Sequence, residues 1–223
     1  IYKKIKFSFH KIYKLEGINQ MLLYNFDSIN IIKNLNFDEK NSWLTLLNYL
    51  NTDDFLYNII KIFGDYIKNS DELLLDLKKI KMRDTVGELS VDQLQIHTRN
   101  NFKYLDINNI DPNKLYTLIN LQNRRDSGGK PAHRDTEYRL FSMILWLCSN
   151  DIPTQFYDGP NRREKGKIIN NLYPNENCAT IFLNNRHSIH AAAPNTKNIN
   201  RESIYLSIIS NQLIWKYISG VND

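Results

Sequence analysis

The chain has 223 residues, of which 42% are hydrophobic and 24% charged, and this ordinary globular composition excludes disorder over its whole length. No apolar run reaches the roughly 18–20 residues of a membrane span, and two cysteines are too few for a disulfide framework. No apolar signal region follows Lys3, Lys4 and Lys6, so we expect a cytoplasmic protein without a membrane span. The sequence begins with Ile1 rather than Met, and we expect it to be part of a larger chain.

The net charge of +5 lies entirely in the second half of the chain. Residues up to Asp111 include 15 basic and 15 acidic side chains, whereas the remainder includes 14 basic and 9 acidic ones. A basic excess favours anionic ligands. Aromatic residues do not interleave with a dense stripe of Lys and Arg, so a nucleic-acid partner is not expected.

The first 93 residues have a mainly helical pattern. Apolar residues recur at helical spacing over Ser42–Leu50, and Thr52 can cap a second helix that runs through Phe63, with Gly64 near its end. A third helix is predicted from a cap at Ser70 through Ile80. We expect residues 1–93 to form a helical support region.

From residue 94 onward the pattern changes to short β-rich runs separated by turn residues. The predicted strands are Leu115–Gln122, Phe141–Leu147, Thr154–Tyr157, Ala179–Leu183 and Ser203–Ile209. No long helical pattern separates them, which disfavours parallel βαβ units and favours an antiparallel sandwich or barrel over residues 94–223. The two regions are expected to form one compact domain together.

A candidate metal site begins with His133 and Asp135. Their spacing places both side chains on the same face of an extended chain. One imidazole and one carboxylate are two members of a 2-His-1-carboxylate triad, which leaves three positions of a non-haem Fe(II) open. The third ligand would be a distant histidine, and His187 and His190 both follow the strand Ala179–Leu183.

A candidate anion site lies at Arg201 and Ser203. Because they are two residues apart, both side chains lie on the same face of the extended chain that leads into the predicted strand Ser203–Ile209. An arginine guanidinium suits bidentate binding of a carboxylate, and the hydroxyl can act as a second donor.

These motifs, His133-Arg134-Asp135, then His190, then Arg201-Glu202-Ser203, resemble the Fe(II)- and 2-oxoglutarate-dependent dioxygenases, in particular their prolyl-hydroxylase-like branch. Phe156-Tyr157-Asp158 also resembles a sequence of that branch, and so does Pro194 four residues after His190. The resemblance covers roughly residues 115–209, under half of the chain. It implies an α+β, mainly β fold: a double-stranded β-helix, which is a jelly-roll or cupin-like core, with the amino-terminal helices packed on one sheet.

The resemblance also implies roles for single residues. Fe(II) would bind His133, Asp135 and His190; His190 is preferred to His187 because of Pro194 and its interval to Arg201. Arg201 and Ser203 would bind the distal carboxylate of 2-oxoglutarate. Further contacts with the cosubstrate are expected from the residues that follow: Gln122 and Arg124 on one strand, and Trp146, which stands where the branch commonly has a tyrosine. Weaker candidates are Ser142 and Thr154, while Arg139 could pair with a substrate anion or simply with Glu137.

The implied activity is hydroxylation of a C–H bond in a small molecule or a peptide side chain, with release of succinate and CO2. Ascorbate could serve as the reductant. One alternative is a metal-binding jelly-roll or cupin-like module without catalysis, which would not need Arg201 as a carboxylate anchor. The other is a structural interaction domain, which would have no tight Fe(II) site.

Overall fold

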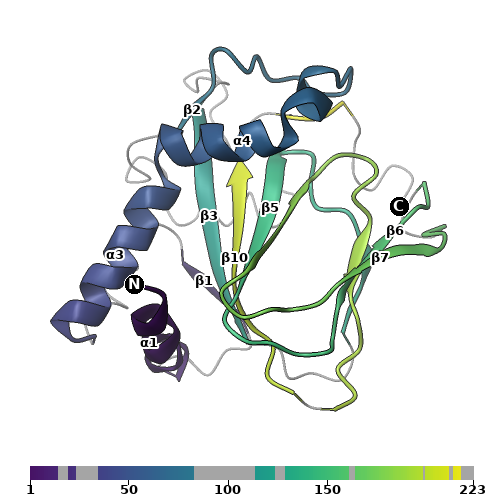
Figure 1. Ribbon diagram of the computed structural model, residues 1–223. Helices are drawn as coiled ribbons and strands as arrows, with labels where there is room; N and C mark the ends of the chain where they lie inside the picture. Colours follow the sequence, from purple (N-terminus) through teal and green to yellow (C-terminus); the bar gives the residue numbers. More distant parts are fainter. Residues whose placement is uncertain are drawn as a thin grey trace, which may run out of the picture.

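The computed structural model describes residues 1–14, 20–23, 35–82, 114–123, 129–160, 164–197, 199–210 and 213–216. These residues are mostly β structure, with two antiparallel sheets and the helices α1 (Tyr2–Lys14), α3 (Phe37–Leu50) and α4 (Asp53–Lys68) (Figure 1). None of the helices in this part of the chain is long and apolar enough to cross a bilayer.

The larger sheet has six strands, and its order is β1 (Gln20–Leu23), β3 (Lys114–Asn123), β10 (Glu202–Ile209), β5 (Arg139–Trp146) and β8 (Ala179–Leu183), with β2 (Lys81–Met82) paired to β3. The smaller sheet has four strands, in the order β4 (Lys130–His133), β9 (His190–Ala192), β6 (Thr154–Tyr157) and β7 (Ile168–Leu172). Neighbouring strands are antiparallel except for the short β2–β3 pair.

Local capping explains where two helices begin. Asn36 and Glu39 form a capping box at the start of α3, and the Thr52 side chain accepts a hydrogen bond from the Phe55 N–H at the start of α4. The helices predicted over 42–50 and after Thr52 are confirmed, with α3 beginning earlier and α4 continuing through Gly64 to Lys68.

Strand β10 is buried on both faces, and the two faces differ in chemistry. Ile204, Leu206 and Ile208 belong to the main hydrophobic core, together with apolar residues of α3 and α4. Each such side chain contributes about 1.5–3 kcal/mol when fully buried. The alternate residues Ser203 and Tyr205 line a cavity that the smaller sheet also lines. The helices therefore stabilise one face of the sheet, while the other face carries the cavity and a smaller apolar cluster of Ile144, Trp146 and Phe182.

The five predicted strands are confirmed, with bounds that differ by at most two residues. Residues 1–93 also supply the strands β1 and β2, which the helical pattern did not indicate. The helix predicted from Ser70 to Ile80 is wrong: Leu73 instead makes a β-bridge with Trp215, and the Leu74 N–H donates to the Ile214 carbonyl. Residues 94–113 and Arg124 lie outside the described residues.

Candidate metal centre

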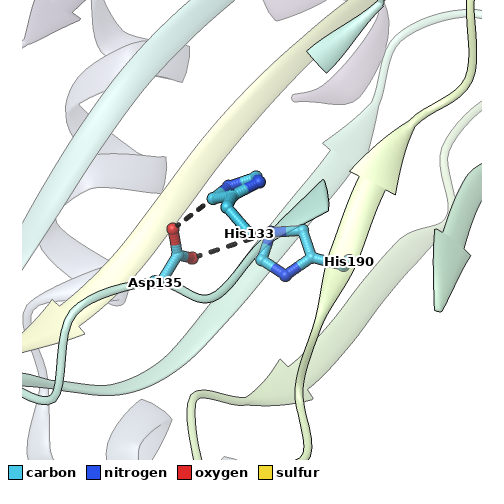
Figure 2. A group of neighbouring side chains, drawn as sticks. All are labelled: His133, Asp135 and His190. Carbon is cyan, nitrogen blue, oxygen red and sulfur yellow. Dashed lines mark ion pairs between the residues drawn. The ribbon is translucent and has the colours of Figure 1, made fainter. Parts of the chain in front are cut away.

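The backbone brings His133, Asp135 and His190 together at one end of the smaller sheet. His133 is the last residue of β4, Asp135 follows two residues later, and His190 is the first residue of β9, directly opposite His133 in the strand register. Figure 2 shows both imidazoles beside the Asp135 carboxylate. One ligand atom from each residue lies within 4.8 Å of those of the others, as a shared metal ion would require.

Backbone carbonyls fix the tautomer of both histidines. His133 Nδ1 lies 2.9 Å from the Pro131 carbonyl, and His190 Nδ1 lies 2.9 Å from the Ser188 carbonyl. A carbonyl only accepts, so each Nδ1 must carry the proton and each Nε2 presents its lone pair. In both residues the carbonyl is two positions earlier in the chain, so the segment that carries each histidine also orients its ring.

Burial keeps both imidazoles neutral, which is the form that binds metals. It is the largest cause that lowers the pKa of His133, to about 3, and the positive charge of Lys130 adds to it. The pKa of His190 is lowered as well, again mainly by burial, although the negative charge of Asp135 opposes this shift.

Asp135 is ionised although it is buried. Burial alone would raise its pKa, but neighbouring positive charges, of which Arg139 is the strongest, hold the pKa well below the ordinary value. The Arg139 guanidinium lies 3.6 Å from Oδ1. The hydroxyls of Ser142 and Tyr205 both donate to Oδ2, and burial followed by the Asp135 charge raises the pKa of Tyr205, so its phenol stays a donor.

The donor set fits a divalent metal. Nε2 of His133 is buried and has no hydrogen-bond partner, which is costly for a polar atom unless a ligand satisfies it. It points toward a carboxylate, with Nε2 3.7 Å from Asp135 Oδ1, while His190 Nε2 lies 4.0 Å from Oδ2. Two neutral imidazoles and one carboxylate on a single side are typical of non-haem Fe(II) sites with open positions.

A narrow cavity of about 40 Å³ adjoins this centre. His133 and His190 line it, together with Gln122, Trp146, Arg201 and Ser203, which the sequence suggested for 2-oxoglutarate. Strand register explains why they meet, since Ser203 on β10 pairs with Gln122 of β3 on one side and with Trp146 of β5 on the other. Of the weaker candidates, Thr154 also lines it, whereas Ser142 contacts Asp135 instead.

Arg201 is held rigidly in the cavity wall. Only 6% of the residue is exposed, its Nη2 donates to Thr154 Oγ1 over 2.8 Å, and its Cζ lies 5.0 Å from the centre of the Trp146 ring. The Trp146 N–H donates to Thr180 Oγ1, so Trp146 offers the cavity an aromatic face rather than the donor that the sequence suggested. Thr154, a weaker sequence candidate, therefore positions the guanidinium.

Lys130 also lines the cavity, and the sequence did not indicate it. A β-bulge sets three steps on β4, from Lys130 to His133, against two on β9, from Ala192 to His190. This irregularity lets both Lys130 and His133 reach the cavity, although the alternation of a regular strand would separate them. The cavity thus carries a second positive charge.

The competing ligand candidate lies elsewhere. His187 is exposed, and its Nε2 accepts a hydrogen bond from Arg186 Nε over 3.1 Å. Among the described residues, the group that could hold a metal consists of His133, Asp135 and His190.

Comparisons with known proteins give a distant likeness only. No family model and no curated protein matches the sequence. Similar solved structures include a prolyl 4-hydroxylase from Phytophthora capsici (14% identity, 94% of this chain and 65% of that one, TM-score 0.35) and a prolyl hydroxylase from Trichoplax adhaerens in complex with a hypoxia inducible factor peptide fragment (14% identity, 93% and 91%, TM-score 0.33). A third is EvdMO1, at 14% identity and TM-score 0.35, where 43% of this chain covers only 27% of the other. With TM-scores this low, the likenesses carry no argument about activity.

Proposed function

We propose that this chain is a non-haem Fe(II)- and 2-oxoglutarate-dependent dioxygenase that hydroxylates a C–H bond of a small molecule or a peptide side chain. The observation that carries the proposal is the cavity that both histidine ligands and the buried Arg201 line together. A metal-binding module without catalysis would need the ligands but not a rigid guanidinium in the same narrow space.

The strand order supports the fold that this function implies. The eight strands β3–β10 divide into the orders β3-β10-β5-β8 and β4-β9-β6-β7, so that first pairs with last and second with second to last. This is the order of a jelly roll, or double-stranded β-helix. In it, residues 1–93 would be the support region that packs on the larger sheet, and residues 94–223 the core.

The roles of the residues follow from their positions. His133, Asp135 and His190 would hold Fe(II), and Arg201 with Ser203 would bind the distal carboxylate of 2-oxoglutarate. When bound, Fe(II) and 2-oxoglutarate supply the chemistry in which O2 is consumed, 2-oxoglutarate becomes succinate and CO2, and R–H becomes R–OH. Gln122 offers a further polar contact in the cavity, and the Trp146 face keeps the guanidinium of Arg201 in place and excludes water from one side of it.

The net negative charge of 2-oxoglutarate fits the two positive charges of the cavity. Arg201 is buried and anchored by Thr154, so it can receive a carboxylate without reorganising. Lys130 is only partly buried and would face the more accessible part of the bound cosubstrate or a nearby substrate anion.

The test uses protein purified without oxygen, with Fe(II) and 2-oxoglutarate added, and follows succinate on exposure to air. Related enzymes turn over the cosubstrate slowly without a substrate, so the substrate need not be known. Succinate from the native protein, with none from His190→Ala or Arg201→Ala, would support the proposal. No succinate from the native protein, together with no spectral change when 2-oxoglutarate is added to the iron form, would favour the non-catalytic module.

A further inference from the structure

Tyr205 connects the cosubstrate cavity with the carboxylate of the metal centre. It lies two residues after Ser203 on the same face of β10, and it lines the cavity with Arg201 and Ser203. Its hydroxyl also reaches Asp135 Oδ2, with which it makes a short hydrogen bond. The same face of β10 therefore carries Ser203, which is proposed to bind 2-oxoglutarate, and Tyr205, which contacts the candidate metal ligand Asp135.

Two hydroxyls converge on one oxygen of Asp135. Those of Tyr205 and Ser142 both lie within hydrogen-bond distance of Oδ2, and Tyr205 Oη also lies 2.8 Å from Ser142 Oγ. Ser142 Oγ in turn accepts from Asn184 Nδ2 over 2.9 Å. Both hydroxyls lie beside Oδ2, whereas Oδ1 lies 3.7 Å from His133 Nε2 and 3.6 Å from Arg139 Nη1, so a metal shared with His133 would bind Oδ1.

We infer that Tyr205, with Ser142, is a positioning residue that makes Asp135 a ligand through one oxygen only. Two histidines and one carboxylate oxygen leave three positions of a six-coordinate metal open, whereas a carboxylate bound through both oxygens would leave two. Chelation by 2-oxoglutarate takes two positions, so dioxygen needs the third. The inference rests on the metal centre of the proposed function, but its test does not depend on turnover.

Neighbouring hydrogen bonds also fix the position of Ser142, one of the two hydroxyls beside Asp135 Oδ2. Arg139 Nη1 donates to Ser207 Oγ over 3.1 Å, and Ser207 Oγ lies 3.3 Å from Ser142 Oγ. Ser142 and Ser207 are paired across β5 and β10. The polar group behind Asp135 is thus built into strand register rather than into a loop, which favours one fixed carboxylate orientation.

The experiment is a titration of the metal-free protein with Co(II), a redox-stable probe, in the native form and in Tyr205→Phe. The matched control is Tyr157→Phe, because Tyr157 is also buried in the strand structure but donates to Gln155. We expect Tyr205→Phe to weaken Co(II) binding by about 10- to 100-fold, as is typical when a partner of a metal ligand is removed. We also expect a weaker visible absorption band, which is typical of a higher coordination number, and no change in Tyr157→Phe.

Ser142→Ala removes the other donor from the same oxygen and provides a second measurement if Tyr205→Phe does not fold. Like Tyr205→Phe, it should weaken Co(II) binding and lower the visible absorption. Native-like Co(II) affinity and spectrum in a folded Tyr205→Phe or Ser142→Ala protein would overturn the inference alone. A native protein that binds no Co(II) would overturn the metal centre as well, so the two failures can be told apart.

Discussion

His133 and His190 face each other across β4 and β9, with their ring centres 4.3 Å apart and each Nδ1 hydrogen-bonded to the carbonyl two residues earlier in the chain. Neither ring can turn its Nε2 away without losing that hydrogen bond. Both rings are therefore already oriented in the metal-free protein, so metal binding would require little further loss of side-chain conformational entropy.

Replacing His190 should abolish stoichiometric metal binding. His190→Ala removes a ligand atom, and we expect a larger effect than the roughly 10- to 100-fold loss that follows from removing a partner of a ligand. His187→Ala is the matched control, since His187 is exposed and lies outside the ligand group. Metal analysis after dialysis would measure the difference, and equal metal contents in the two variants would contradict the assignment of His190.

Arg201 should control affinity for 2-oxoglutarate. Losing two charge-assisted hydrogen bonds, each worth about 1.5–3 kcal/mol, should raise the dissociation constant by at least roughly 100-fold in Arg201→Ala. Lys197→Ala removes an exposed positive charge that pairs with Asp151 and should leave the constant unchanged. Calorimetric titration of the metal-loaded proteins would measure both, and tight binding by Arg201→Ala would refute this role.

Acid should destabilise the metal-free protein through His133. The ordinary pKa of 6.5 is lowered to about 3 in the folded chain, mainly by burial, so between these values the unfolded chain binds a proton that the folded chain does not. The free energy of unfolding must then fall as the pH falls through this window, by about 1.4 kcal/mol per pH unit for each such proton. The lowered pKa of His190 acts in the same direction, whereas the contribution of Asp135 is lost only at lower pH.

Urea unfolding of chelator-treated protein, from pH 7 down to about pH 4, would measure this slope. His133→Gln should flatten it, because one of the buried imidazoles is gone. His187→Gln, at an exposed position, should keep it. The same slope in all three proteins would show that His133 is not the group responsible.

Gly129 should be essential for the position of β9. Its φ is +66°, and a Cβ there would lie 2.5 Å from the Ala192 carbonyl oxygen. Gly129→Ala therefore combines a left-handed backbone cost of about 1–2 kcal/mol with a clash against the strand that begins at His190. We expect a lower melting temperature and weaker Co(II) binding together. Gly64→Ala is the contrasting variant, because nothing lies within 4 Å of a Cβ there and alanine should stabilise α4 by about 0.5–1 kcal/mol.

The sequence indicated those parts of the fold whose pattern is local. β-rich runs gave β3, β5, β8 and β10 of the larger sheet and β6 of the smaller one, and Thr52 marked the start of α4. Strands β4, β7 and β9 were missed because they are short, β4 contains Pro131, and β7 is exposed along nearly its whole length, so burial leaves no alternation in its sequence. The helix predicted after Ser70 failed because Leu73, Leu75 and Leu77 pack on the core at every second position while Leu74 is exposed.

At the candidate site too, the sequence indicated the residues whose spacing is local and missed those that depend on the pairing of strands. Spacing placed Arg201 and Ser203 on one face, and the same rule could have added Tyr205, which stands at the next position of that face. Lys130 could not have been predicted, because only the bulge in β4 brings it into the cavity beside His133. That His133, Asp135 and His190 hold iron stays a prediction.

The alternation of residues along β10 limits where this protein can be engineered. Its odd-numbered residues from 203 to 207 serve the polar interior, and its even-numbered ones serve the helix-packed core. One inserted or deleted residue would exchange the two sets at once, burying serine hydroxyls against α3 and α4 and turning isoleucines toward the cavity that His133 and His190 line. A single substitution along β10 alters one face only, whereas a shift of the alternation alters both, so new loops or tags are better placed elsewhere in the chain.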